Sequence, residues 1–145
     1  MVYVKYDNGF YGVYSSSPIS KGLIVYGMSP TGTHDKPTRT SIQIDESVHI
    51  EDSVGRYINH ACNPTVRIDG LSVIAVRDIK TDEEITFNYM ENESIMANPF
   101  KCSCCGKWIG GKDFEKDYKK RLAILDELTE LSQEIGLYDE LKTEK

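Results

Sequence analysis

The sequence predicts a mainly β fold that is followed by an amphipathic α-helix near its carboxyl end. Through the first hundred residues, short β-prone runs alternate with turn signals rich in Gly, Pro and Asn. After Gly110-Gly111 the composition changes to Glu, Lys and Leu, and the leucines recur at helical spacing. We therefore divide the chain into a core over 1–99, a cysteine-containing segment over 100–112, and a helix with a tail over 113–145.

The first part of the core shows several strand and turn signals. Residues 2–4 are β-prone, and residues 8–9 are an Asn-Gly turn signal. Residues 22–27 form an apolar run between two glycines. Residues 29–40 contain Pro, Gly and several Thr, which predicts a surface loop. Residues 41–45 alternate apolar and polar side chains, as a half-buried strand does.

The second part of the core continues this pattern. Residues 71–76 predict a strand, residues 80–82 a turn, and residues 85–87 another short strand. The sequence contains no internal repeat. We therefore expect many short strands and few helices in the core.

An apolar stripe predicts one amphipathic helix over 113–135. Its members recur at steps of three or four residues, and they are Leu122, Leu125, Leu128, Leu131 and Ile135. Acidic residues in the first turns complement the helix dipole, and Gly136 is placed for a C-cap. The stripe can pack against the domain that precedes it, or it can pair with the same helix of a second copy in a homodimer.

Length and composition limit the classes of function. A chain of 145 residues with 39% hydrophobic residues can bury a core without a disulfide framework. No apolar run reaches the roughly 18 residues of a membrane span, and no signal peptide is visible, so we expect a cytoplasmic or nuclear protein. The net charge of −6 argues against direct nucleic-acid binding and favours a basic protein or peptide partner. The plainer explanation is that mild acidity aids solubility.

Two segments are the most informative about function. Residues 56–64 are R-Y-I-N-H-A-C-N-P, and residues 83–89 are E-E-I-T-F-N-Y. In this order, with a strand-like run between them, they resemble the two signature motifs of the SET-domain protein lysine methyltransferases. The resemblance covers residues 9–112. It implies the SET fold, in which small, mostly antiparallel sheets surround a knot-like crossing of the two segments, and peptide and cofactor enter one channel from opposite faces.

The resemblance implies S-adenosylmethionine as the methyl donor. Asn59 and His60 match the Asn-His pair through which the family binds this cofactor, and an Asn side chain offers both a donor and an acceptor. Arg56 is expected in the same region as a support for this loop. Tyr89 is expected to border the cofactor as well as the substrate.

Two further stretches resemble cofactor-binding parts of the family. The first comprises Phe10, Tyr11 and Gly12, which match a glycine-containing opening segment, with Phe10 in place of its first glycine. Contact with the cofactor is expected there because glycine permits close backbone approach. The second contains Trp108, which can close over the cofactor or the lysine channel as aromatic residues of the post-SET segment do. Its alternative role is core packing.

Three aromatic residues are candidates for the methyl-transfer channel. The transfer is an in-line displacement at the sulfonium methyl, so a neutral lysine amine must be held close to it. Aromatic walls desolvate the ammonium and tolerate the methylated product. By resemblance, Tyr89 orients the amine, and Phe87, at a position where the family has Phe or Tyr, leaves room for di- or trimethylation. Tyr57 can line the channel or simply pack, and Asn88 replaces the usual Asp.

The cysteines Cys62, Cys102, Cys104 and Cys105 predict a metal site rather than disulfides. Many relatives carry a post-SET segment C-x-C-x4-C that binds zinc together with the cysteine of the first motif. Here the third cysteine of that segment would fall at Ile109, so Cys105 has to substitute for it. Side chains of adjacent cysteines diverge, which would strain a site made of all four. The alternative is four reduced, partly buried thiols.

We therefore expect an S-adenosylmethionine-dependent protein-lysine N-methyltransferase that di- or trimethylates a lysine in a basic protein such as a histone tail. The loop over 29–40 and the strand over 41–45 are expected to help form the peptide groove. Two hypotheses compete with this one. A catalytically silent SET-fold binding module is favoured by Phe10, by Asn88 and by the incomplete cysteine pattern. A small zinc-binding structural protein is favoured by the cysteine cluster alone.

Overall fold

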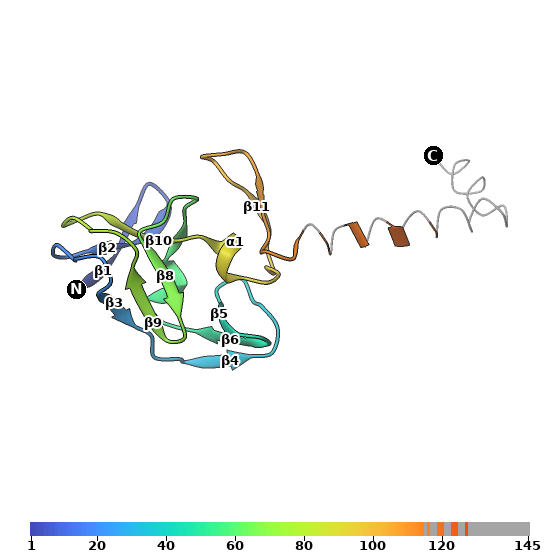
Figure 1. Cartoon of the computed structure of the whole chain (residues 1–145), viewed down its shortest axis with the longest axis horizontal. Coiled ribbons are helices and arrows are strands. Elements are labelled where there is room, and N and C mark those ends of the chain that lie inside the picture. Colours follow the sequence, from blue (N-terminus) through green and yellow to red (C-terminus); the bar gives the residue numbers. More distant parts are fainter. Residues whose placement is uncertain (115, 117–118, 121–122, 125–126, 128–145) are drawn as a thin grey trace. The chain divides into compact units, whose positions relative to one another are not determined.

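The computed structural model describes residues 1–114, 116, 119–120, 123–124 and 127. Residues 1–112 form one compact unit, which is described here by itself (Figure 1). Within this unit nearly all regular structure is β, so the mainly β class is confirmed. Among the described residues, no helix combines the length and the hydropathy needed to cross a bilayer.

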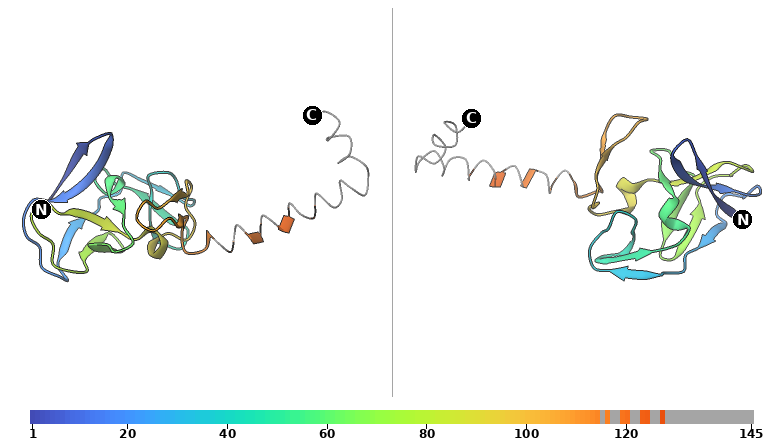
Figure 2. Two further views of the ribbon diagram at one scale, coloured as in Figure 1. Left: turned by 90° about the horizontal axis from the view of Figure 1, so that it is seen from above. Right: turned by 180° about the vertical axis from the view of Figure 1, so that it is seen from behind.

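The largest sheet has four strands in the order β1-β2-β10-β7. β1 (Val2–Asp7) and β2 (Phe10–Ser15) form an antiparallel hairpin, which Figure 2 shows from two further sides. The predicted turn over 8–9 connects them, with both residues at positive φ. β10 (Glu84–Phe87) lies antiparallel to β2, and β7 (Asn59–His60) lies parallel to β10.

Two three-stranded antiparallel sheets complete most of the unit. The first has the order β3-β9-β8, with bounds Ile24–Gly27, Ser72–Ala75 and Val66–Asp69. The second has the order β4-β6-β5, with bounds Gly32–His34, Val48–Glu51 and Ile42–Asp45. The shorter elements are the 3-10 helix η1 (Gly55–Tyr57), the helix α1 (Tyr89–Asn92), and the hairpin of β11 (Phe100–Lys101) and β12 (Trp108–Ile109).

The hydrophobic core joins these sheets. β10 contributes three consecutive buried residues, because its two faces are both covered. The other principal members of the core come from β2, β3, β5, β6, β8 and β9, and they are Val13, Val25, Ile42, Ile50, Val66, Val73 and Ala75. A strand buried on both faces holds a fixed position, which matters because β10 leads directly into the site described below.

The strands predicted at 2–4, 22–27, 41–45, 71–76 and 85–87 are found, and the structure adds further short strands, among them β4, β6 and β8. β4 lies inside the segment 29–40, for which we predicted only a loop. Its three residues form a strand because they pair with β6 along a sheet edge, and such a short polar run has no alternating pattern of its own. The helix expected over 113–135 falls largely outside the described residues, so this helix and its possible homodimer stay predictions.

Candidate active site

The two segments singled out in the sequence lie side by side. β7 and β10 pair in parallel, with Thr86 opposite Asn59 and Phe87 opposite His60. Just beyond this pairing, the amide of Ala61 donates to the carbonyl of Phe87 at 3.2 Å. Side chains of both segments therefore surround one place in the fold.

Tyr89 is the first residue of α1 and is separated from β10 only by Asn88. Asn88 caps this helix, because its side chain accepts a hydrogen bond from the Met90 amide at 3.0 Å. The Tyr89 hydroxyl donates to the backbone carbonyl of Ile58. Burial, and then the charge of Glu93, raises the pKa of Tyr89, so the phenol keeps its proton at neutral pH. Asn88 thus fills a capping role for which Asp is equally suited.

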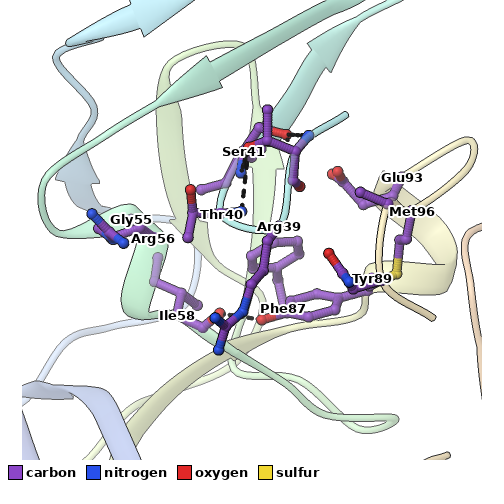
Figure 3. A pocket seen from close by; sticks show the side chains of 14 residues that line it. Arg39, Thr40, Ser41, Gly55, Arg56, Ile58, Phe87, Tyr89, Glu93 and Met96 are labelled. Atoms are coloured by element: carbon purple, nitrogen blue, oxygen red, sulfur yellow. Dashed lines mark hydrogen bonds between the residues drawn. The ribbon is translucent and has the colours of Figure 1, made fainter. Parts of the chain in front are cut away.

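Phe87 and Tyr89 line a groove, whose side chains Figure 3 shows. Phe87 is only 3% exposed, and its ring centroid lies 4.7 Å from that of Tyr89. The remaining walls come from residues 38–42, from Gly55, Arg56 and Ile58 around η1, and from Glu93 and 96–98 after α1. The loop and strand that we expected beside a peptide groove thus do contribute to a groove.

Glu51 of β6 fixes the loop over 38–40, which forms one wall of this groove. Its carboxylate accepts hydrogen bonds from the hydroxyls of Thr38 at 2.6 Å and Thr40 at 2.7 Å. The Nε2 atom of His34 lies 3.5 Å from the same carboxylate. Burial acts to raise the pKa of Glu51, but the two threonine hydrogen bonds and nearby cations outweigh it and lower the pKa. The carboxylate is therefore ionised at neutral pH and anchors the loop on both sides of Arg39.

A buried carboxylate forms part of another wall. Glu93 is 5% exposed, and its Oε2 accepts hydrogen bonds from the Gln43 amide at 3.0 Å and from Nδ2 of Asn92 at 2.6 Å. Burial, the largest influence, raises the pKa of Glu93. Sequence reasoning missed both Glu93 and Glu51, because a single glutamate in a polar stretch gives no signal of burial.

His60 connects the backbone of Tyr89 to the cysteines. The Tyr89 amide donates to Nδ1 of His60 at 3.0 Å, which places the proton of the neutral imidazole on Nε2. Nε2 in turn lies 3.5 Å from Sγ of Cys62. Burial lowers the pKa of His60 and so favours this neutral form. Besides the cofactor role that we expect for it, His60 therefore holds two parts of the site together.

The Asn59 side chain forms hydrogen bonds with β2 and with β10. Its Nδ2 donates to the Tyr11 carbonyl at 2.8 Å and to Oε2 of Glu84 at 2.9 Å. A Cβ atom at Gly12 would lie 3.0 Å from the ring of Tyr14 and 3.3 Å from the Glu84 carboxylate. A side chain at this position would therefore crowd Tyr14 and Glu84, and the expected contact of this segment with the cofactor stays a prediction.

The four cysteines converge. The Sγ atoms of Cys62, Cys102, Cys104 and Cys105 all lie within 4.8 Å of one another. The Gly106 amide, at a φ of 72°, donates to the Cys102 carbonyl at 2.9 Å and closes the turn that carries Cys102, Cys104 and Cys105. Hydrogen bonding with Cys104, the first of several causes, lowers the pKa of the Cys102 thiol. The adjacent residues Cys104 and Cys105 thus face a common point, although we expected their side chains to diverge.

This arrangement fits a zinc ion. A tetrahedral site with Zn–S bonds of about 2.3 Å separates its sulfurs by roughly 3.8 Å. The close sulfur pairs here lie 3.0 to 3.7 Å apart, and each cysteine is a free thiol. Four thiolates around one point are the donor set of structural zinc sites.

The hairpin of β11 and β12 presents aromatic side chains on opposite faces. Phe100 pairs with Ile109 and Lys101 pairs with Trp108, so Phe100 and Trp108 point to different sides. The Phe100 ring lies edge-on to His60 at 5.9 Å and to Tyr89 at 6.1 Å. Trp108 is 59% exposed, so core packing does not explain it.

The family model described as the SET domain matches residues 10–90, which is more than half of the chain. The chain belongs to the SET domain family. The match includes β2, both motif segments and Tyr89, and it ends before the cysteines of 102–105. The resemblance that the sequence suggested is thereby confirmed.

Several curated SET relatives are methyltransferases. The methyltransferase flvH of Aspergillus flavus is 33% identical over 99 residues, which covers 59% of this chain and 54% of that protein. The H3 lysine-36 specific histone-lysine N-methyltransferase of Chaetomium globosum is 34% identical over 89 residues, or 52% of this chain and 10% of that protein. The variant-silencing SET domain-containing protein of Plasmodium falciparum is 39% identical over 75 residues, which is 43% of this chain. This chain spans only 3% of the Plasmodium falciparum protein and 10% of the Chaetomium globosum protein.

Solved structures agree on the fold. The humanized mutant of the Chaetomium thermophilum polycomb repressive complex 2 superposes with a TM-score of 0.51 at 18% identity, over 77% of this chain and 19% of that one. An active polycomb repressive complex 2 in its basal state gives the same TM-score at 23% identity, over 61% of this chain and 15% of that one. The SET fold expected for this chain is confirmed.

Within this SET domain, Tyr57 lies apart from the groove that Phe87 and Tyr89 line. Its ring centroid is 4.7 Å from that of Tyr11, which in turn is 4.8 Å from that of Tyr6. The guanidinium of Arg56 lies over the Tyr57 ring at 5.2 Å. Tyr57 therefore packs against Tyr11 of β2 in a row of three aromatic rings. Phe10, the first residue of β2, is 77% exposed.

Proposed function

We propose that this SET domain is an S-adenosylmethionine-dependent protein-lysine N-methyltransferase. One observation supports this most strongly: the phenol of Tyr89 and the carbonyl of Ile58 meet beside the Phe87 ring in the groove. A lysine amine that enters there finds the Ile58 carbonyl as an acceptor and the Tyr89 hydroxyl as a second oxygen. The two oxygens can orient its lone pair, and the aromatic rings remove water from the ammonium and favour its neutral form.

The cofactor supplies an electrophilic methyl group on a sulfonium. Asn59, His60 and the backbone of Phe10, Tyr11 and Gly12 would hold it, with Arg56 supporting the loop and Trp108 covering its exposed side. This assignment is supported by Gly12, which leaves no side chain over the backbone of β2, and by the Asn59 amide, which donates to the Tyr11 carbonyl of that strand. These residues would bind and orient the cofactor, while Tyr89 would orient the amine.

Phe87 supports repeated methylation. Its ring has no hydroxyl that could hold a water beside the amine, so further methyl groups have room. Relatives named as H3 lysine-36 or H3 lysine-4 specific histone-lysine N-methyltransferases make a basic protein such as a histone tail the first substrate to try. We propose di- or trimethylation of such a protein, in the nucleus or the cytoplasm.

A zinc ion would complete the site. Cys62, Cys102, Cys104 and Cys105 would bind it, and the ion would fix the hairpin that carries Phe100 and Trp108. Because Cys62 also lies beside His60, the same ion would stabilise the contact between His60 and the Tyr89 amide.

The test is to incubate the purified chain with methyl-labelled S-adenosylmethionine and a mixture of histones and other basic proteins, and to map products by mass spectrometry. We expect di- or trimethyl-lysine at a defined position. Cofactor binding without transfer to any protein would instead support the catalytically silent binding module. Absence of both, together with unfolding by a chelator, would support a structural zinc protein.

A further inference from the structure

We propose that Arg39 selects substrates in which an acidic side chain lies next to the target lysine. This inference rests on the proposed function, because it assigns a substrate feature to the same groove. It concerns the sequence around the lysine and leaves the overall charge of the substrate protein open.

The loop presents Arg39 to the groove in a defined way. The residues on either side, Thr38 and Thr40, both donate their hydroxyls to Glu51, and the Ser41 hydroxyl accepts the Thr38 amide at 2.8 Å. The neighbours of Arg39 are thus tied to β6, whereas Arg39 itself lines the groove and is exposed. Figure 3 shows its side chain extending from this loop toward the side of the groove where Ile58 and Tyr89 meet.

Arg39 has no carboxylate partner within the described part of the chain. The ion pairs there are Arg67 with Asp69 and Arg77 with Glu83, and the pair of His34 with Glu51 is ionic only when His34 is protonated. A guanidinium presents a planar fork of donors that matches a carboxylate in two parallel hydrogen bonds. An unpaired guanidinium on an anchored loop is therefore prepared to bind an external carboxylate, with little ordering needed on the protein side.

The groove combines this cation with a group of oxygens. Glu93, the Ile58 carbonyl and the Tyr89 hydroxyl supply negative or acceptor character, which suits the amine of a lysine. Arg56 also lines the groove, but its guanidinium already lies over the Tyr57 ring and its charge acts on Glu51. Arg39 is thus the cation available to the peptide, and a lysine beside an Asp or Glu complements the pattern.

The test uses a peptide library in which a single lysine is flanked, at two positions on each side, by Glu, Ala or Lys. For the wild-type chain we expect kcat/KM to be about tenfold higher for the best Glu-flanked peptide than for its Ala counterpart, as is reasonable for a charge-assisted pair at a groove rim. For Arg39→Glu we expect the preference to reverse in favour of the Lys-flanked peptide. The wild-type preference should shrink as salt is raised, because the pair is solvent-accessible.

Lys36→Glu is the matched control, since it makes the same charge change in the same loop at a residue that does not line the groove. It should keep the wild-type preference. Calorimetric binding of the same peptides in the presence of S-adenosylhomocysteine gives a second readout that does not depend on turnover. Transfer without a preference for acidic flanks, or a preference that Arg39→Glu leaves unchanged, would overturn the inference while the proposed function stands. Cofactor binding with no transfer to any peptide would overturn both.

Discussion

The proposed role of Phe87 can be tested by counting the methyl groups on the product lysine. It is buried against Tyr89, with ring centroids 4.7 Å apart. In Phe87→Tyr the added hydroxyl would place a polar group, and a water that it holds, in the space that the growing methylammonium needs. We expect the product to shift from di- and trimethyl-lysine to monomethyl-lysine, with the first transfer largely kept. Mass spectrometry of the modified peptide measures this ratio, and an unchanged ratio would remove Phe87 from the proposed role.

At this scale the sequence identified some residues and missed others. Tyr89 and His60 were predicted to lie in one site because they sit in motifs whose order and spacing are specific, and the structure brings them together, while their roles stay predictions. Glu93 and Glu51 were missed, because their burial and partners arise from contacts with Gln43 and with the loop over 38–41. These contacts join residues far apart in the chain, and no local pattern encodes them.

At the scale of elements, the loop over 38–41 depends on β6. In Glu51→Ala the hydroxyls of Thr38 and Thr40 lose their acceptor, and the loop is no longer tied to the sheet. We expect the KM for a peptide to rise about five- to tenfold, with faster amide hydrogen exchange in the loop and unchanged cofactor affinity. His34→Ala is the matched control, because it removes the ion pair of Glu51 but leaves both threonine hydrogen bonds. Equal effects of the two variants would contradict the anchoring role.

The cysteine turn gives a second prediction at this scale. We expect one zinc per chain by elemental analysis, and loss of this zinc in Cys105→Ser, because three sulfurs no longer close the site. Chelation of the wild-type metal should lower the melting temperature by about 5 °C or more. A chain that is purified with four thiols accessible to a thiol reagent and no metal would contradict the site.

Local patterns predicted the mainly β class and some of its strands, but they did not predict how distant segments pair. The strands at 41–45 and 85–87 were found from alternation and composition. β4 was missed because it forms only through pairing with β6. The convergence of Cys104 and Cys105 was also missed, because it depends on the turn at Gly106 and on the approach of Cys62 from another segment.

At the scale of the whole molecule, Glu93 links stability to pH. Its pKa is raised in the folded state by burial, so the folded chain holds this proton more tightly than the unfolded chain. Its contribution to stability is therefore present below the ordinary glutamate pKa of about 4.3 and is lost as the pH rises through the raised pKa. Relative to Glu93→Gln, the wild-type chain should gain stability as the pH falls from about 8 to about 4.

Urea unfolding of both proteins across this range measures the difference. Glu91→Gln is the control, since Glu91 is an exposed residue of the same helix. A difference between wild type and Glu93→Gln that stays constant with pH, or that grows in the opposite direction, would contradict the buried and raised state of Glu93.

At this scale, family membership establishes the fold of the chain but not its activity. The SET fold follows from the match over residues 10–90 and from the solved structures. The relatives share only part of their length with this chain, so methyl transfer and its substrate depend on the groove and must be tested on this protein.

The most direct test compares wild type with Tyr89→Phe in methyl transfer to a lysine substrate, alongside calorimetric binding of S-adenosylmethionine. Removing one hydroxyl takes away the oxygen that would orient the amine and one hydrogen bond to Ile58. We expect transfer to fall by about 100-fold or more, with cofactor affinity kept and unfolding free energy reduced by only about 1 kcal/mol. Transfer by Tyr89→Phe at the wild-type rate would contradict the proposed methyl-transfer site.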